Sequence, residues 1–395
     1  MGLSRGPNKL VKNTSKIKNI ELNQILTNVK NYSNAIEETD SLGNNSTDPL
    51  ILGLYGEVGS VMAIAKKRYR EQKVYSKNLA QTEEELGDTL WYLITLCRRL
   101  KIDLIEIFTH PLAHHIKQRK YYGPSMEISI NSIETENLFS ALFDLGKSAA
   151  ALLEKHKSTL ETKNLLIKFI HSFLCVVKIT NCNFETIMEK NSEKALGRFT
   201  MPRHSELPIF DQGFCEDERL PEYFEITIAQ KKSGKCYLKW HGVFIGDPLT
   251  DNNAENDGYR FHDVFHLAFA AILHWSPTFR SLIKHKRKSK PEVDEQEDGG
   301  RAIVIEEGLT AWIFSVAKQQ NYFENQDKLS FDLLKTIQEF IKGYEVENCP
   351  LNLWERAILD GYKVFNQIRK NNGGIVIGDR VERTITYKHL DGINQ

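Results

Sequence analysis

The 395-residue sequence has no excess of either charge, no clustered cysteines and no long apolar run. Its 52 basic residues equal its 52 acidic residues in number, so no overall field favours nucleic acid or a membrane surface as partner. The six cysteines form no C-x-x-C pair, which is typical of reduced thiols in a cytoplasm. Apolar residues nowhere run together for about 18 positions, the length that spans a bilayer. We therefore expect a cytoplasmic protein with neither membrane nor nucleic acid as partner.

A chain of this length predicts two or three domains of about 100–200 residues each. Most segments have helical spacing of their apolar residues, and one later segment alternates as strands do. The sequence thus predicts a mainly α protein whose C-terminal domain is mostly helical with a small β-hairpin or sheet. The expected parts are a flexible arm at 1–17, a helical domain at 18–122, a second helical segment at 133–200, a proline-containing linker at 201–222 and a C-terminal domain at 223–390.

Two predicted helices near the front carry acidic residues within apolar surroundings. Glu57 lies on the first, and Glu84, Glu85 and Asp88 begin the second, directly before Leu-Trp-Tyr-Leu. Residues three or four apart share one face of a helix, so Glu85 and Asp88 point together. Carboxylates beside a buried stripe are costly unless they are paired or hold a cation, and clusters of oxygen ligands suit Mg²⁺.

These helices resemble the MazG-type nucleoside triphosphate pyrophosphohydrolases, whose signature is E-x-x-E on one helix and E-x-x-D on the next. Glu85 and Asp88 match the second half, and the G-D-x-L-W-Y-L continuation is typical of the family. Glu57 matches the first half, but its partner position is Ser60, so one expected ligand is absent. The resemblance implies an all-α helical bundle at 18–122.

The resemblance also implies hydrolysis of a nucleoside triphosphate, NTP or dNTP, to the monophosphate and pyrophosphate, with Mg²⁺ (or Mn²⁺) as cofactor. Glu57, Glu85 and Asp88 would hold the metal, and Glu84 would act as substitute ligand or general base. The basic residues that end the first helix have two interpretations: they bind substrate phosphate, or they only complement the helix dipole. These residues are Lys66, Lys67 and Arg70.

Residues 135–199 have the same order of helical segments as the first domain. When Gly56 is aligned with Gly146, Glu57 corresponds to Lys147. When Ile107 is aligned with Ile187, Glu85 corresponds to Leu165 and Asp88 to Lys168. The pattern favours a degenerate second copy that acts as a built-in partner, an internal pseudo-dimer, over an unrelated helical hairpin. A homo-oligomer of the whole chain is a further possible assembly.

A second candidate site lies in the C-terminal domain, after a predicted hairpin at 223–245. His262 and His266 are four residues apart on an apolar helix, the spacing that metal-binding helices use, with Asp263 between them. Glu306 and Glu307 lie on a later apolar helix. The residues predict either a Zn²⁺ site or a buried polar network without metal. A weaker phosphohydrolase interpretation combines His241 with His262 and Asp263.

Two further interpretations follow for the C-terminal domain. The charged stretch 285–301 is expected to be a solvated loop rather than a phosphate-binding lid. The MazG-like half, short of one ligand, could instead be a nucleotide-binding or assembly module. In that case, the site of His262, His266 and Glu307 would carry a hydrolase activity, or the C-terminal domain would serve assembly alone.

Overall fold

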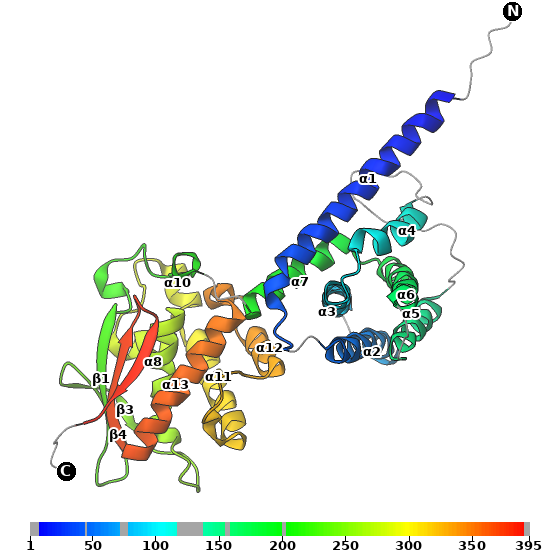
Figure 1. Ribbon diagram of the computed structural model, residues 1–395. Helices are drawn as coiled ribbons and strands as arrows, with labels where there is room; N and C mark the ends of the chain where they lie inside the picture. The colour runs from blue at the N-terminus through cyan, green and yellow to red at the C-terminus, as the bar shows by residue number, and fades with distance from the viewer. Residues whose placement is uncertain are drawn as a thin grey trace, which may run out of the picture. The chain divides into compact units, whose positions relative to one another are not determined.

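The computed structural model describes residues 8–43, 46–71, 78–116, 137–154, 159–199 and 203–390. Two compact units divide the chain, Met1–Thr200 and Met201–Gln395, and each is described by itself. The first is helical, and the second joins helices to a five-stranded antiparallel sheet. The predicted fold class, mainly α with a small sheet, is therefore confirmed (Figure 1).

The N-terminal unit is built from seven α-helices and one short 3₁₀ helix within the described ranges. Residues 8–17 of the expected arm belong to the first helix, whereas residues 1–7 lie outside the described part of the chain. The helices are α1 (Asn8–Ala35), η1 (Glu37–Thr39), α2 (Asp48–Glu71), α3 (Asn78–Arg99), α4 (Leu104–Ile116), α5 (Leu138–Leu152), α6 (Thr159–Ile179) and α7 (Phe184–Phe199).

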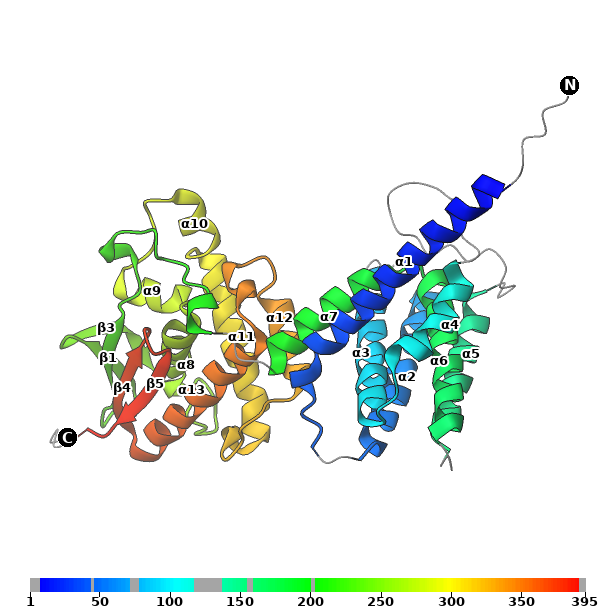
Figure 2. The same cartoon turned by 45° about the horizontal axis from the view of Figure 1, so that its top comes forward.

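Two helix pairs form the centre of this unit, α2 with α3 and α5 with α6. Figure 2 shows these four helices side by side, with α1 and α7 crossing the bundle together. Helix α7 packs on α3, and α4 packs on α6 in the corresponding way. Each pair therefore receives a helix that follows the other pair in sequence.

The connection from α3 to α4 has the same hydrogen bonds as the connection from α6 to α7. The amide of Ile102 donates to the carbonyl of Cys97 over 2.9 Å, and the amide of Cys182 donates to the carbonyl of Val177 over 3.0 Å. Both partners are displaced by the same 80 positions (102 to 182 and 97 to 177), which is also the displacement between Ile107 and Ile187. The two turns thus share one backbone conformation.

Among the described residues, one helical stretch, Asp48–Lys67, is long and apolar enough to cross a membrane by length and composition. The pair Leu160–Ile179 and Phe184–Arg198 passes the same test together but is bent by 103°. Core helices of soluble proteins pass this test too, so one such helix is weak support for a span. Helix α2 packs on α3 and α5 in the bundle.

The C-terminal unit contains the strands and the remaining helices. The terminal strands follow the longest helix of this unit. The strands are β1 (Tyr223–Gln230), β2 (Cys236–Trp240), β3 (Val243–Leu249), β4 (Gly373–Asp379) and β5 (Thr384–Lys388). The helices are η2 (His204–Glu206), η3 (Glu216–Glu218), η4 (Tyr259–Phe261), α8 (Asp263–Ala268), the π-helical η5 (Phe269–Leu273), α9 (Pro277–Ile283), α10 (Pro291–Gln296), α11 (Gly300–Gln319), η6 (Asn321–Phe323), α12 (Phe331–Phe340), η7 (Glu345–Asn348) and α13 (Leu351–Asn371).

The sheet has the order β3-β2-β1-β4-β5, and every neighbouring pair is antiparallel. The predicted hairpin is β1 with β2, and the strands at the end of the chain join it because β4 pairs with β1. Phe224, Ile226 and Ile228 alternate inward along β1, so one face of the sheet is buried. Helices α8 and α13 cover that face (Figure 1).

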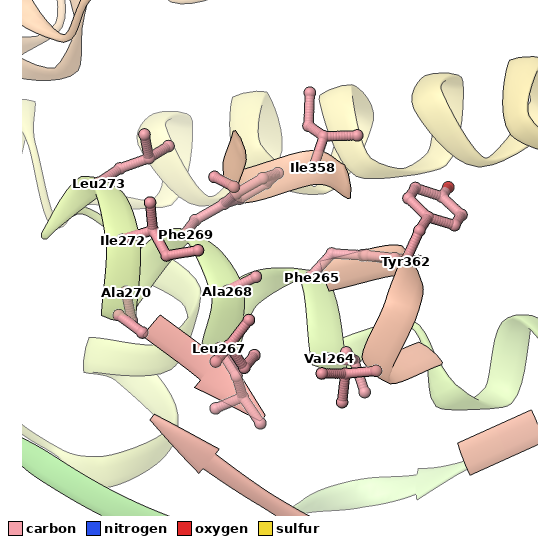
Figure 3. Packing of buried hydrophobic residues seen from close by; sticks show 14 of the residues in the cluster. Val264, Phe265, Leu267, Ala268, Phe269, Ala270, Ile272, Leu273, Ile358 and Tyr362 are labelled. Atoms are coloured by element: carbon pink, nitrogen blue, oxygen red, sulfur yellow. The ribbon is translucent and has the colours of Figure 1, made fainter. Parts of the chain in front are cut away.

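The core of this unit forms where α8 and η5 pack against α13, because this segment is buried on every side. Figure 3 shows its apolar side chains interleaved with those of Ile358 and Tyr362. The rings of Phe265 and Tyr362 lie 4.4 Å apart between centroids. Gly361 permits this approach, since a Cβ there would lie 3.0 Å from the Cβ of Ala268.

The expected linker at 201–222 is corrected by the structure, because its apolar residues Leu207, Phe214 and Leu220 are buried in the C-terminal core or beside it. Asp211 anchors the segment. Its carboxylate accepts hydrogen bonds from Arg280 at 2.6 Å and from Arg380 at 2.8 Å. Spaced prolines mark an irregular backbone but do not exclude a buried one.

The solvated loop expected at 285–301 is likewise only partly correct. Helix α10 lies within it, and Arg287 is 1% exposed. The guanidinium of Arg287 bonds the carboxylate of Asp298 at 2.8 Å and that of Glu345 at 2.7 Å. Glu345, which is distant in the sequence, stabilises the buried charge of Arg287. The local sequence had predicted that this charge would be exposed to solvent.

Replacing Asp211 with Asn should destabilise the C-terminal unit by about 3–5 kcal/mol, because buried Arg380 loses its carboxylate partner and buried Arg280 loses the nearer of its carboxylates, while Asp298 lies at 3.7 Å. The measurement is the free energy of unfolding from denaturant titration. Lys363→Gln is the control, since its pair with Asp360 is at the surface and should contribute no more than about 1 kcal/mol. Equal stability of both variants would contradict the anchoring role of Asp211.

Candidate functional site

The close approach of α2 and α3 places the acidic residues of the two helices opposite each other. Gly53 lies one turn before Glu57, and a Cβ at Gly53 would be 2.2 Å from a ring carbon of Tyr92. The ring of Tyr92 therefore occupies the space that a side chain at position 53 would fill. A glycine in a helix costs about 1 kcal/mol of stability, and here the close packing accounts for it.

Three carboxylates converge in this contact. Glu57 of α2 and Glu85 and Asp88 of α3 each offer an oxygen, and these oxygens all lie within 4.8 Å of one another. All three side chains are half-buried. The structure thus brings together the three residues predicted to hold a metal.

The electrostatics of Glu57 reflect its burial beside two other carboxylates. Burial raises the pKa of Glu57 to about 7, and the charges of Asp88 and Glu85 add to the increase. A hydrogen bond between Glu57 and Glu85 acts in the same direction. Carboxylates this close cannot all be ionised without a proton or a cation between them.

Helix α7 completes the cluster from the opposite side. The ammonium of Lys194 lies 2.6 Å from a carboxylate oxygen of Asp88 and 3.0 Å from one of Glu84. The amide of Asn191 donates to the other oxygen of Asp88 over 2.9 Å, and the hydroxyl of Tyr32 on α1 donates to Asn191 over 2.7 Å. Asp88 is therefore oriented by two helices outside the predicted motif.

Lys194 remains positively charged in this position. Burial lowers the pKa of its ammonium, but the charges of Asp88 and Glu84 raise the pKa by more, so the pKa lies above its ordinary value. Lys194 pairs with Asp88 and Glu84, while the converging oxygens of Glu57, Glu85 and Asp88 form a donor set that fits a Mg²⁺ or Mn²⁺ ion.

The remaining predicted residues of this unit lie at different distances from the cluster. Glu84 shares Lys194 with Asp88. Ser60 is half-buried one turn after Glu57. The basic group predicted to bind phosphate lies in the last third of α2, and its members are exposed: Lys66, Lys67 and Arg70.

In the C-terminal unit, His262, Asp263 and His266 also come together. All three are buried, and one ligand atom of each lies within 4.8 Å of the others. Glu306 and Glu307 of α11 face the two imidazoles, at 2.9 Å from Glu306 to His266 and at 3.5 Å from Glu307 to His262. His241 is exposed at the β2–β3 turn and is not part of this group of described residues.

Sequence reasoning missed Lys194 and Asn191. Both lie over 100 positions from Asp88, so no local spacing connects them to it. The available signal was their separation of three residues on one helix, together with the predicted second copy that would face the first.

Comparison with known proteins gives one match. Residues 205–391 match the family model of the MazG C-terminal domain. The match supports a MazG-related family. It covers the C-terminal unit of this chain and not the unit that holds the carboxylate cluster. No curated protein and no solved structure matches the chain.

Replacing Glu57 with Gln should stabilise the metal-free N-terminal unit above neutral pH. The carboxyl has a pKa of about 7 when folded and an ordinary value of 4.5, so its stabilising contribution is present at low pH and is lost as pH rises through 7. At about pH 8 we expect the variant to melt about 2–4 °C above the wild type, allowing for solvent screening of this half-buried group. At about pH 4 the difference should vanish.

Magnesium provides the matched comparison, and calorimetry measures all of these melting temperatures. Added Mg²⁺ should raise the melting temperature of the wild type at about pH 8 and leave that of Glu57→Gln nearly unchanged. A variant that melts lower than the wild type without metal, or that gains as much from Mg²⁺, would contradict the assignment of Glu57.

Proposed function

We propose that this MazG-related protein is a Mg²⁺-dependent nucleoside triphosphate pyrophosphohydrolase that converts an NTP or dNTP to the monophosphate and pyrophosphate. The observation that carries the proposal is the convergence of Glu57, Glu85 and Asp88 to within 4.8 Å in a half-buried contact. The match of residues 205–391 supports a nucleotide-hydrolase type of function at the level of the family. The carboxylate motif adds the reaction and the cofactor.

In this proposal Glu57, Glu85 and Asp88 hold the metal ion through their oxygens. When bound, Mg²⁺ or Mn²⁺ would neutralise the triphosphate and lower the pKa of a coordinated water. Asn191 and Lys194 keep the carboxylate of Asp88 in the required orientation. A partner of this kind tunes a ligand without binding the metal itself.

The ammonium of Lys194 has a second part in the proposal. It lies between Asp88 and Glu84 at the edge of the cluster, where phosphate oxygens of a metal-bound substrate would arrive. Movement of the ammonium from Glu84 to phosphate would raise the basicity of the Glu84 carboxylate, which would then accept a proton from water. Glu84 is therefore the proposed general base, and Lys194 is the proposed switch between the two states.

We further infer that residues 137–199 are a degenerate copy of the first half of the unit. The support is the shared turn 80 positions apart and the reciprocal packing of α4 on α6 and of α7 on α3. The positions that correspond to the metal ligands hold Lys147, Leu165 and Lys168, so this copy cannot bind a cation in the same way. The chain then carries one carboxylate site, and the second copy contributes Asn191 and Lys194 to it.

Asp88→Asn should lower the rate of pyrophosphate release by at least about 10²-fold, because metal-ion stabilisation of the transition state contributes several kcal/mol. The assay is a panel of NTPs and dNTPs with Mg²⁺, followed by detection of pyrophosphate. Lys147→Gln is the matched control, since Lys147 takes the position of Glu57 in the second copy and is exposed. Full activity of Asp88→Asn would assign any hydrolysis to the C-terminal unit instead.

Lys194→Gln should lower kcat/KM by about 10–100-fold, the usual effect of losing a group that orients a metal ligand. The control is Lys190→Gln on the same helix, whose ammonium lies 2.6 Å from Glu83 and whose side chain is 50% exposed. This pair lies outside the carboxylate cluster, so its loss should leave catalysis unchanged. Equal kinetics of the two variants would remove Lys194 from the site.

A further inference from the structure

The two imidazoles of the C-terminal unit are held in the orientation that metal-binding histidines adopt. The Nδ1 atom of His262 lies 2.9 Å from the carbonyl oxygen of Tyr259, which assigns the proton to Nδ1 and leaves the lone pair on Nε2. The Nδ1 atom of His266 lies 2.9 Å from a carboxylate oxygen of Glu306. Metal-ligating histidines almost always direct their second nitrogen to a carbonyl or carboxylate in this way.

Glu306 is fixed as a supporting group. It is fully buried, and its carboxylate accepts hydrogen bonds from the hydroxyl of Ser276 at 2.7 Å and from the amide of Thr278 at 2.8 Å. Ser276 and Thr278 lie at the N-terminus of α9, so a separate helix holds Glu306 against His266. Both ring nitrogens of His266 are buried without a well-directed hydrogen bond, so Glu306 holds Nδ1 by proximity and charge while Nε2 faces Glu307.

Two further carboxylates face the free nitrogens. The oxygens of Glu307 lie 3.5 Å from Nε2 of His262 and 3.4 Å from Nε2 of His266. Asp263 is 8% exposed and has neither a hydrogen bond nor an ion pair with any described residue. Carboxylate oxygens beside two buried imidazoles form a donor set that fits a cation.

We propose that His262, Asp263, His266 and Glu307 form a binding site for a divalent transition-metal ion of the zinc type. Two imidazole nitrogens with carboxylate oxygens suit Zn²⁺, whereas Mg²⁺ prefers a site of oxygens alone. The side chain of Glu307 is 38% exposed, so the site opens to solvent on the α11 side. Metal centres with an open side leave a coordination position for water or for an oxygen of a substrate.

This site is independent of the carboxylate cluster in the N-terminal unit. The two differ in donor atoms, nitrogen and oxygen here and oxygen alone there, and they lie in different units. The chain would therefore bind two kinds of metal, tight zinc in one unit and exchangeable magnesium in the other. The match to the MazG C-terminal domain assigns no metal to residues 205–391.

The test is metal binding by the full chain. The protein is stripped with a chelator and titrated with Zn²⁺, and the bound metal is measured by elemental analysis after gel filtration. Co²⁺ replaces Zn²⁺ in a parallel sample and reports the ligand field in its visible spectrum. We expect one equivalent of tightly held Zn²⁺ that Glu57→Gln leaves in place. Absence of stoichiometric zinc in the folded wild type would overturn the proposal.

Variants locate the ion. His266→Ala should abolish tight zinc binding, and Glu306→Gln should weaken it about 10–100-fold by releasing the orientation of His266. Glu307→Gln changes a side chain that is partly exposed, so it tests the site even if His266→Ala fails to fold. His241→Asn is the control and should retain full binding, because His241 is exposed and outside the cluster. Unchanged affinity in Glu307→Gln and Glu306→Gln would show that these residues form a polar network without metal.

Discussion

The N-terminal unit depends on keeping several carboxylates together in a half-buried helix contact. Glu57, Glu85 and Asp88 repel one another, and the pKa of Glu57 rises to about 7 through burial and through the charges of the other two. Lys194 offsets part of this repulsion by its ion pair with Asp88. Under the proposed function a divalent cation would relieve the repulsion that remains, so the same feature would lower stability without metal and provide affinity for the metal.

The proposed internal pseudo-symmetry would give this arrangement a physical basis. Helix α7 lies on α3 as α4 lies on α6, so each half of the bundle covers the other. The first half provides acidic residues, and the second half provides Asn191 and Lys194 to hold one of them. The C-terminal unit follows a related principle, in which Glu306 is held by the N-terminus of α9 and in turn orients His266.

Local patterns predicted much of this structure. The spacing of Glu85 and Asp88 within one helix, and of His262 and His266 within another, follows from helix periodicity and was readable directly. The hairpin was predicted from the alternation of apolar residues within 223–245, and the structure extends it because β4 pairs with β1. The partners of the buried charged groups could not be predicted from local patterns. Lys194, Ser276 and Glu345 lie far along the chain from the groups they contact. For the same reason the burial of Arg287 within the charged stretch 285–301 was not predicted.

The most direct test of the central claim is a crystal structure of the full chain with Mn²⁺ and a non-hydrolysable dNTP analogue. An anomalous-scattering peak should lie among the oxygens of Glu57, Glu85 and Asp88, with the triphosphate against it and the ammonium of Lys194 on a phosphate oxygen. A peak at another place would contradict the account. So would a structure in which nucleotide binds elsewhere and the cluster holds no metal, with Lys194 still paired to Asp88 and Glu84.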